Sequence, residues 1–397
     1  MVKIGVGLIS VGWMGRLHSR AYRAVHEHFP ELNVDPVLVI AADPVQSSAA
    51  EAVSRLGYRE ATADYREVLA HPDVNVVSIC APNFLHLEFA EAAAAAGKPF
   101  WIEKPMGRNL VESSAIAHAA HAAGVVTAVG FNYRHAPTLE YARDLIRSGD
   151  LGRVTNLRVS LLADYSSDPD GALTWRFERE RAGSGVLGDL LAHGVDLAHY
   201  LAGRISEVTA MTRTFITTRP LPSGVGASHF SKGDATGARG AVQNEDYAAV
   251  LARFENGAIG TFESSRVAVG PHAEYVVEVY GTLGSLRWDF QRMNELQVAT
   301  VAGGSGYRTL FAAPGFGEFA RFQPGAGTGM GFDDLKTIEA YQFLRSVVEN
   351  EQLAPSVADG NAAAAVIQAA EDGAASGAWQ RVASVDGPLT YDKPRPS

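Results

Sequence analysis

The sequence predicts an α/β protein in two parts, a parallel doubly wound sheet followed by an α/β domain with a mostly antiparallel sheet. Three observations lead to this prediction. Apolar runs alternate with helical stretches over the first 130 residues, strand-like segments later follow one another without helices, and 397 residues are too many for one hydrophobic core. We place the boundary between residues 1–130 and residues 131–397.

The N-terminal part alternates strand and helix signals in strict order. Apolar runs predict strands at 4–10, 37–42, 74–81, 100–102 and 125–131. Helical stretches lie between them, at 13–28, 44–56, 85–96 and 110–123. Right-handed crossovers bring the loops that follow parallel strands to one sheet edge, so functional residues are expected at the carboxyl ends of the strands.

The C-terminal part has a different pattern. Strand-like segments lie at 154–165, 208–217, 246–254, 257–266, 275–281 and 285–290. The hairpin signal Glu255-Asn256-Gly257 and the glycines at 281 and 284 join neighbouring strands, which favours an antiparallel arrangement. Helices are expected at 188–201, 336–350 and 359–376, and long loops at 219–239 and 303–331.

Composition excludes several classes of protein. The chain is 47% apolar and 20% charged, with a formal net charge of −10, which argues against binding to nucleic acid through its phosphates. Its one cysteine, Cys80, excludes an intrachain disulfide and a cysteine-rich zinc site, and no other metal-ligand pattern is present, so no metal is expected. Without a leader pattern or an apolar run of about 20 residues, we expect a cytoplasmic location and no membrane association.

The turn after the first expected strand has the spacing of a dinucleotide-binding fingerprint. It reads Ser10-Val11-Gly12-Trp13-Met14-Gly15, with serine where the fingerprint Gly-x-Gly-x-x-Gly has its first glycine. Gly12 would let the backbone approach a pyrophosphate, and Gly15 would let helix and strand pack closely. We expect Ser10, Gly12, Trp13, Met14 and Gly15 to bind the cofactor; a plain tight turn is the alternative.

Asp43 ends the second expected strand. A carboxylate there would accept hydrogen bonds from the adenosine ribose and repel a 2′-phosphate, which favours NAD over NADP. It is also a good N-cap before Pro44, and both roles are compatible.

Two further turns end strands at the same edge. Ala81-Pro82-Asn83 follows one strand, and His86 lies in the first turn of the next helix; Asn83 and His86 either contact a ligand or cap that helix. Glu103-Lys104-Pro105 follows the next strand, and its proline allows a cis peptide bond.

Asp189 and His193 are candidates for the chemistry. Four residues apart on an expected helix, they share one face, and the glycine-rich run before them permits close approach to a ligand. Histidine has the near-neutral pKa that a base needs when an alcohol is oxidised. An ordinary exposed i,i+4 pair is the alternative.

Together these segments resemble one enzyme family, the Gfo/Idh/MocA oxidoreductases (glucose–fructose oxidoreductase, inositol dehydrogenase and relatives). The resemblance covers nearly the whole chain, and it rests on Ala81–His86, Glu103–Pro105, Gly130–Arg134, Trp175–Phe177 and Gly183–His193. The segment from Asp164 to His193 is most similar to the anhydrosugar dehydrogenases of that family.

The resemblance implies a Rossmann domain joined to an α/β domain with a large open sheet, commonly in dimers or tetramers. It implies NAD as cofactor, with Ala81, Pro82, Asn83, His86, Glu103 and Lys104 near it, and a catalytic set of Lys104, Asp189 and His193. Whether Lys104 or His193 takes the proton stays open.

Four residues are candidates for a sugar pocket, namely Tyr133, Arg134, Trp175 and Arg176, alongside Asp189 and His193. Aromatic faces stack on sugar C–H surfaces and arginine donates forked hydrogen bonds, although each residue also suits plain packing. The expected function is oxidation of a secondary hydroxyl of a sugar, anhydrosugar or polyol. The alternatives are a keto-sugar or nucleotide-sugar reductase, a redox-neutral NAD-dependent glycoside-cleaving enzyme, and a non-catalytic nucleotide-binding regulator, which would not need the Lys104, Asp189 and His193 set.

Overall fold

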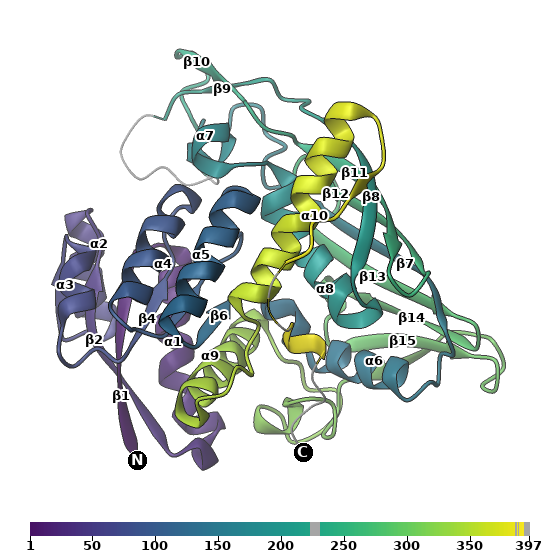
Figure 1. Cartoon of the computed structure of the whole chain (residues 1–397), viewed down its shortest axis with the longest axis horizontal. Helices are drawn as coiled ribbons and strands as arrows, with labels where there is room; N and C mark the ends of the chain where they lie inside the picture. The colour runs from purple at the N-terminus through teal and green to yellow at the C-terminus, as the bar shows by residue number, and fades with distance from the viewer. Residues whose placement is uncertain (223–230, 386, 388, 393–397) are drawn as a thin grey trace.

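The structure of this chain is a computed structural model that describes residues 1–222, 231–385, 387 and 389–392 (Figure 1). Part of the expected loop at 219–239 therefore lies outside the described residues. Two sheets dominate the molecule, one at each side of Figure 1, with the C-terminal helices between them.

The first sheet is parallel and six-stranded. Its strands are β1 (Val2–Ile9), β2 (Val34–Ala42), β3 (Glu60–Thr62), β4 (Val76–Ile79), β5 (Phe100–Ile102) and β6 (Thr127–Val129). The order is β3-β2-β1-β4-β5-β6, and it reverses between β1 and β4, where doubly wound sheets bind ligands. Its helices are α1 (Trp13–His28), α2 (Gln46–Glu51), α3 (Tyr65–Ala70), α4 (His86–Ala95) and α5 (Leu110–Ala123).

This half confirms the predicted fold class. The short elements β3 and α3 were not predicted, because β3 is three residues long, largely exposed and without an apolar run. The predicted helix at 44–56 starts later, at Gln46, and its second half, Ala52–Leu56, is a π-helical turn.

The second sheet has nine strands and is mostly antiparallel. They are β7 (Val154–Ala163), β8 (Ile205–Arg213), β11 (Tyr247–Phe254), β12 (Ile259–Ser265), β13 (Ala273–Gly281), β14 (Gly284–Asp289), β15 (Glu295–Thr300), β16 (Arg308–Phe311) and β17 (Gln380–Arg381). Their order is β16-β15-β14-β13-β7-β12-β11-β8-β17, with β12 and β7 as the parallel pair. The predicted hairpin joins β11 to β12, and Gly257 in it has the left-handed φ of 85°.

Sequence reasoning missed several elements of this half. Strand β15 falls in a stretch for which no element was predicted, and β16 falls in the loop expected at 303–331. The short pair β9 (Thr218–Pro220) and β10 (Arg239–Ala241) was not predicted either. Helix α6 (Pro137–Arg147) was missed too, although it has proline in its first turn, a common helix start.

Four further helices belong to the C-terminal half of the chain. The short α7 (Arg179–Ala182) precedes α8 (Ala192–Ala202), which is buried along its whole length and packs on β7. The last two helices return to the first sheet, α9 (Phe332–Glu349) against α1 and α10 (Val357–Ser376) against α5 and β8. In Figure 1, α10 runs between the two halves of the molecule. The boundary at residue 130 stays a prediction.

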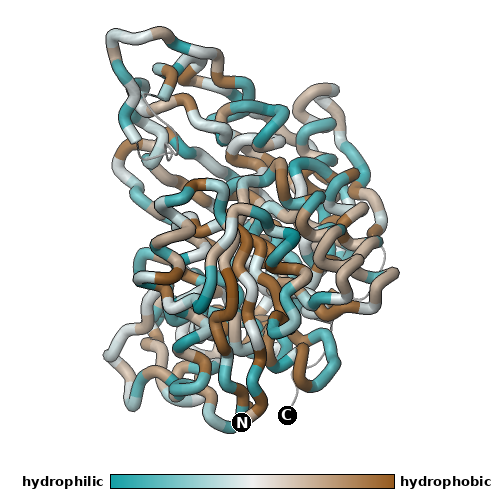
Figure 2. The backbone as a smooth tube through the Cα atoms, turned by 90° about the vertical axis from the view of Figure 1, so that its left-hand side faces the viewer, coloured by the Kyte–Doolittle hydropathy of each residue, from teal (hydrophilic) through white to brown (hydrophobic). Residues whose placement is uncertain are grey.

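The core follows the strands. Figure 2 shows hydrophobic residues gathered along the strands of the first sheet in the middle of the view. Trp101 in β5 and Trp288 in β14 are the largest fully buried side chains, one in each sheet. Among the described residues no helix is long and apolar enough to cross a membrane, and no cluster of three or more histidine, cysteine, aspartate or glutamate side chains is placed to hold a metal ion.

Candidate active site

The turn between β1 and α1 has the geometry of a phosphate-binding turn. Ser10 has a φ of 76°, in the left-handed region where the fingerprint places glycine, so the serine substitution keeps the turn. A Cβ at Gly15 would lie 2.3 Å from the Ser10 carbonyl oxygen, so only glycine lets α1 begin this close to β1. A Cβ at Gly12 would meet nothing within 4 Å, so this position borders open space.

The N-terminus of α1 faces that space without a side-chain cap. Its first N–H groups are therefore available to an anionic ligand, which the helix dipole also favours. Trp13 is exposed and stacks on Phe332 at the start of α9, with 5.9 Å between ring centroids, while Met14 is half-buried. The residues of this turn fit a dinucleotide pyrophosphate.

Asp43 is buried at the end of β2 and holds the same turn in place. One carboxylate oxygen accepts from the Val11 N–H at 2.8 Å, and the other accepts from the Val45 N–H at 2.9 Å. Because α2 starts at Gln46 with Val45 as its N-cap, Asp43 is not the N-cap of α2. The carboxylate therefore lies beside the fingerprint turn, where a ribose of a bound dinucleotide is expected.

Asn83 and His86 cap no helix with their side chains, and both are held by backbone carbonyl groups. The Asn83 amide donates to the Ala182 carbonyl at 2.9 Å and ties the turn after β4 to the loop before Gly183. His86 lies within hydrogen-bonding distance of the carbonyls of Ala81, at 2.8 Å, and Pro105, at 3.0 Å. Burial lowers the pKa of His86. Its ring joins the Ala81-Pro82 turn to the Lys104-Pro105 turn and is not exposed to a ligand.

Lys104 reaches from the first sheet to the second half of the chain. Its ammonium donates to the Asp189 backbone carbonyl at 2.6 Å and lies 3.2 Å from Asp189 Oδ1. The Lys104–Pro105 peptide bond is cis. Lys104 and Asp189, two members of the expected catalytic set, are therefore in contact although they lie 85 residues apart in sequence.

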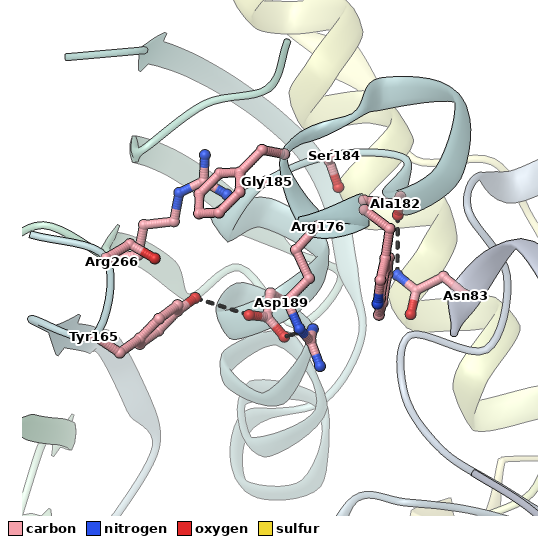
Figure 3. A pocket seen from close by; sticks show the side chains of 11 residues that line it. Asn83, Tyr165, Arg176, Ala182, Ser184, Gly185, Asp189 and Arg266 are labelled. Carbon is pink, nitrogen blue, oxygen red and sulfur yellow. Dashed lines mark hydrogen bonds and ion pairs between the residues drawn. The ribbon is translucent and has the colours of Figure 1, made fainter. Parts of the chain in front are cut away.

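Asp189 is the centre of a group of polar side chains (Figure 3). The Tyr165 hydroxyl donates to its Oδ2 at 2.7 Å, and an Arg176 guanidinium nitrogen lies 3.5 Å from its Oδ1. Asp189 belongs to a π-helical turn, Leu187–Leu191, and not to a regular α-helix as predicted. Such turns are frequent at functional sites because they redirect side chains.

His193 is the second residue of α8, directly after the π-helical turn, and its side chain is buried. Its ring packs against Tyr133, with 4.4 Å between centroids, and against Phe131, at 6.1 Å. Burial and, next, the positive charge of Lys104 lower the pKa of His193 well below its usual value. The imidazole is therefore neutral at neutral pH, the form that can accept a proton.

Trp175 and Arg176 form one wall of a pocket that also includes Asp189. The Arg176 guanidinium lies over the Trp175 ring at 4.6 Å, and the edge of Phe84 meets that ring at 6.1 Å. The pocket is lined by Asn83, Tyr165, Ser166, Trp175, Arg176, Phe177, Ala182, Ser184, Gly185, Asp189 and Arg266. An aromatic face beside a guanidinium and a carboxylate suits a polyhydroxylated ligand.

Tyr133 belongs to the apolar side of this region. Burial raises its pKa well above the usual value, and its ring contacts Phe290 and Tyr275 as well as His193. The structure thus places Tyr133 against the candidate base, but as part of an aromatic cluster.

Two predicted site residues lie elsewhere. Arg134 is buried in ion pairs with Asp196 and Asp359 and donates to Thr390, so its donors are engaged away from the pocket. The substrate contact expected of Arg134 is therefore corrected, because a buried guanidinium with two carboxylate partners is not available to a sugar. The Glu103 side chain turns into the interior, toward Lys336 and His18, so its carboxylate does not face a cofactor.

Tyr165 was missed by sequence reasoning. It lies two residues after the end of β7, the strand that pairs in parallel with β12. Its position just past a strand end is a weak signal, and only the fold brings it to Asp189.

Comparison with known proteins agrees with this geometry. The family pattern "Oxidoreductase family, NAD-binding Rossmann fold" matches residues 4–131, and "GFO/IDH/MocA C-terminal domain" matches residues 139–287. The chain is 38% identical to levoglucosan dehydrogenase of Pseudarthrobacter phenanthrenivorans over 388 residues, which cover 97% of this chain and all of the relative. This chain belongs to the Gfo/Idh/MocA family of oxidoreductases.

Other similarities support the same assignment. Myo-inositol 2-dehydrogenase of Thermotoga maritima is 25% identical over 77% of this chain and 81% of that protein. Among solved structures, levoglucosan dehydrogenase in complex with NADH and L-sorbose has a TM-score of 0.91 at 37% identity, covering 97% of this chain and all of that one. The oxidoreductase domain protein from Kribbella flavida has a TM-score of 0.89 at 34% identity, with 97% and 100% covered. The chain is thus an NAD-binding oxidoreductase.

Proposed function

We propose that this oxidoreductase is a dehydrogenase that oxidises a secondary hydroxyl of a sugar, an anhydrosugar or a polyol. The observation that carries the proposal is the contact of Lys104 with Asp189, beside a neutral His193. Three side chains from two halves of the chain converge there, next to a pocket walled by Trp175 and Arg176. A nucleotide-binding regulator would have no use for this arrangement.

The cofactor fits the turn at the start of α1. We assign the pyrophosphate to the N–H groups of the turn that contains Ser10, Gly12, Trp13, Met14 and Gly15, and the adenosine ribose to Asp43. Residues Ala81, Pro82 and Asn83 would line the nicotinamide side. NAD, when bound, supplies the acceptor for a hydride from the carbinol carbon of the substrate. The Asp43 carboxylate would repel the 2′-phosphate of NADP.

We assign the proton to His193. As the hydride leaves the carbinol carbon, the hydroxyl proton must leave as well, and the neutral imidazole can accept it. Lys104 would donate a hydrogen bond to the reacting oxygen, because an ammonium has three N–H donors and only Asp189 engages them in the described part of the chain. Asp189, fixed by Tyr165, would orient Lys104 and accept from a neighbouring hydroxyl.

The pocket supports a ring-shaped polyhydroxylated substrate. Trp175 offers a flat apolar face and Arg176 a forked donor, which together match the C–H and hydroxyl surfaces of a sugar. Because the chain is similar to levoglucosan dehydrogenase over nearly its whole length, an anhydrosugar is the first substrate to test.

The test is an absorbance assay for NADH with purified protein. NAD or NADP is combined in turn with levoglucosan, inositol, other polyols and aldoses, and each product is analysed by mass spectrometry. The proposal predicts NADH formation with at least one of these compounds and a preference for NAD. Reduction of keto-sugars without the reverse oxidation would favour a reductase, and sugar cleavage without net NADH would favour the redox-neutral enzyme. No turnover with any compound would contradict the proposal.

We also propose a cytoplasmic homo-oligomer, a dimer or tetramer. Support comes from the outer face of the nine-stranded sheet, where Met211 in β8, Leu251 in β11 and Ile259 in β12 are at least half exposed on neighbouring strands. A second copy would cover this apolar face. Light scattering is expected to give a dimer or tetramer and a smaller species for Leu251→Arg; a monomeric wild type would contradict the proposal.

A further inference from the structure

A group of four buried titratable side chains lies behind the Lys104 turn. It consists of His18 from α1, Glu103 from the turn, and Lys336 and Glu339 from α9, and we call it the inner ionic cluster. Lys336 is 1% exposed, Glu339 2%, Glu103 6% and His18 not at all. None of these side chains reaches the pocket, and the proposed chemistry does not use them.

Lys336 is the centre of the cluster. Its ammonium lies 2.6 Å from Glu103 Oε1 and 2.7 Å from Glu339 Oε2. His18 Nε2 lies 2.9 Å from the same Glu103 oxygen, and the His18 ring stacks on Trp101 at 3.4 Å. Helices α1 and α9 therefore meet at the carboxylate of Glu103.

The charges are fixed by these contacts. Burial by itself would raise the pKa of Glu103, but the Lys336 ammonium and the hydrogen bonds from His18 and Lys336 outweigh it and hold that pKa below its usual range. Burial lowers the pKa of His18 to about 4, so the ring is neutral at neutral pH. Burial also raises the pKa of Glu339, which Lys336 only partly offsets. Lys336 and Glu103 are thus the charged pair at the centre.

Glu103 transmits this contact to Lys104. Its second oxygen, Oε2, accepts from the Lys104 backbone N–H at 3.3 Å. Gly130 follows directly after β6, and a Cβ there would lie 2.6 Å from that oxygen. The glycine therefore leaves the space that the Glu103 carboxylate occupies. The path from α9 to the active site runs through Lys336, Glu103, the Lys104 backbone and the Lys104 ammonium to Asp189.

We propose that Lys336 is a positioning residue for Lys104, acting through the Glu103 carboxylate. Burying the Lys336–Glu103 ion pair together with the carboxyl group of Glu339 costs free energy that an apolar core would avoid, so stability alone is a weak reason for the cluster. The cluster lies directly behind Lys104, whose ammonium contacts Asp189 of the pocket, and this position gives it a second use. The expected effect of Lys336 variants on kcat rests on the proposed dehydrogenase function.

Two matched variants separate positioning from simple stability. Lys336→Met keeps most of the unbranched side chain but removes the contacts with Glu103 and Glu339, while Glu339→Gln replaces the Glu339 carboxyl group and leaves the Lys336–Glu103 contact. We expect Lys336→Met to lower kcat at least tenfold with KM for NAD and sugar changed less than threefold. Glu339→Gln should keep kcat within about twofold. The proposal would be overturned if, in both variants, kcat fell in the same proportion to the drop in melting temperature.

A labelling experiment tests the same inference without a substrate. A brief pulse of acetic anhydride modifies lysines, and mass spectrometry compares acetylation of Lys104 with that of the exposed Lys3 in the same sample. Lys336→Met should raise the Lys104 to Lys3 ratio at least threefold because Lys104 is released from Asp189, and Glu339→Gln should leave it unchanged. An unchanged ratio in both variants would overturn the proposal.

These readouts also distinguish the two proposals. An inactive wild type with the expected labelling pattern would contradict the dehydrogenase function alone. An active wild type with unaltered kcat and labelling in Lys336→Met would contradict the positioning role alone. If Lys336→Met does not fold, Lys336→Gln takes its place; it keeps an N–H that can reach toward Glu103, and at least a threefold fall in kcat is then expected, with no fall overturning the proposal.

Discussion

Glu103 and Lys104 are consecutive residues with opposite surroundings. The Glu103 carboxylate is buried, and each of its oxygens accepts a hydrogen bond, from Lys336 and His18 on one side and from the Lys104 N–H on the other. The Lys104 ammonium is partly exposed and, among the described residues, its hydrogen bonds go only to Asp189, which lines the pocket. On the inner side of the turn, the hydrogen-bonding capacity of Glu103 is taken up by partners within the protein. On the outer side, Lys104 keeps N–H donors for a substrate.

The difference shows how one turn combines two tasks. Buried charges must be satisfied by fixed partners, so the inner side is rigid. A reacting group must keep some of its hydrogen-bonding capacity, so the outer side is held by fewer contacts and borders a pocket. Variants on the two sides should therefore lose different properties.

Two buried histidines give the sharpest contrast. His193→Ala removes the proposed proton acceptor, and we expect kcat to fall roughly 100-fold or more with the melting temperature little changed. His18→Leu removes a hydrogen bond to Glu103, and we expect a loss of about 1–3 kcal/mol of unfolding free energy with a smaller effect on kcat. Kinetics and urea denaturation of both variants check this. Equal losses of kcat would break the distinction between the two sides.

Tyr165→Phe tests the outer side more gently. The substitution removes only the hydroxyl that donates to Asp189 Oδ2 at 2.7 Å, so Asp189 should lose part of its orientation. A hydrogen bond to a charged group contributes about 1.5–3 kcal/mol, so kcat/KM should fall about tenfold or more. The melting temperature should change less than in His18→Leu. A kcat/KM at the wild-type value would show that Asp189 does not depend on Tyr165.

The pH dependence of the unfolding free energy depends on four buried histidines, among them His18 on the inner side and His193 on the outer side. Burial lowers the pKa of His18 to about 4 and of His199 to about 3, and it also lowers those of His86 and His193. The unfolded chain binds these protons near pH 6.5 and the folded chain does not, so stability is complete above that pH and falls as the pH drops.

Each such proton contributes about 1.4 kcal/mol per pH unit between 6.5 and the folded pKa. Asp196 acts the other way, because burial raises its pKa to about 6 and the folded chain binds its proton more tightly. Urea denaturation at pH 7, 6 and 5 should therefore show a steep loss of unfolding free energy as the pH falls. His18→Leu should make the slope of unfolding free energy against pH smaller by the contribution of about one proton. An unfolding free energy that does not change between pH 7 and 5 would contradict the claim that the buried histidines are neutral in the folded chain.

The fold was largely predictable because its signals are local. Strands and helices of the first sheet alternate within short stretches, and Gly257 marks a hairpin by its own conformational need. The return of α9 and α10 to the first sheet was not predicted, because nothing in their own sequences says which surface covers them.

The site was predictable where a motif carried it and not where distant residues meet. Lys104, Asp189 and His193 were predicted from the family resemblance, and the structure brings Lys104 to Asp189 and places His193 nearby in α8. The cluster of His18, Glu103 and Lys336 was missed because its members lie 85 and 233 residues apart in sequence. Arg134 looked like a sugar ligand because sequence cannot show that Asp196 and Asp359 bury it.

The most direct test of the account is the rate of NADH formation by wild type and Lys104→Ala on the best substrate of the panel. Loss of the ammonium should raise the barrier by at least about 2 kcal/mol, a fall in kcat/KM of roughly 30-fold or more. The melting temperature should stay near that of Lys3→Ala, a control at the exposed start of β1. Near-normal NADH formation by Lys104→Ala would contradict the central claim that Lys104 acts at the reacting hydroxyl.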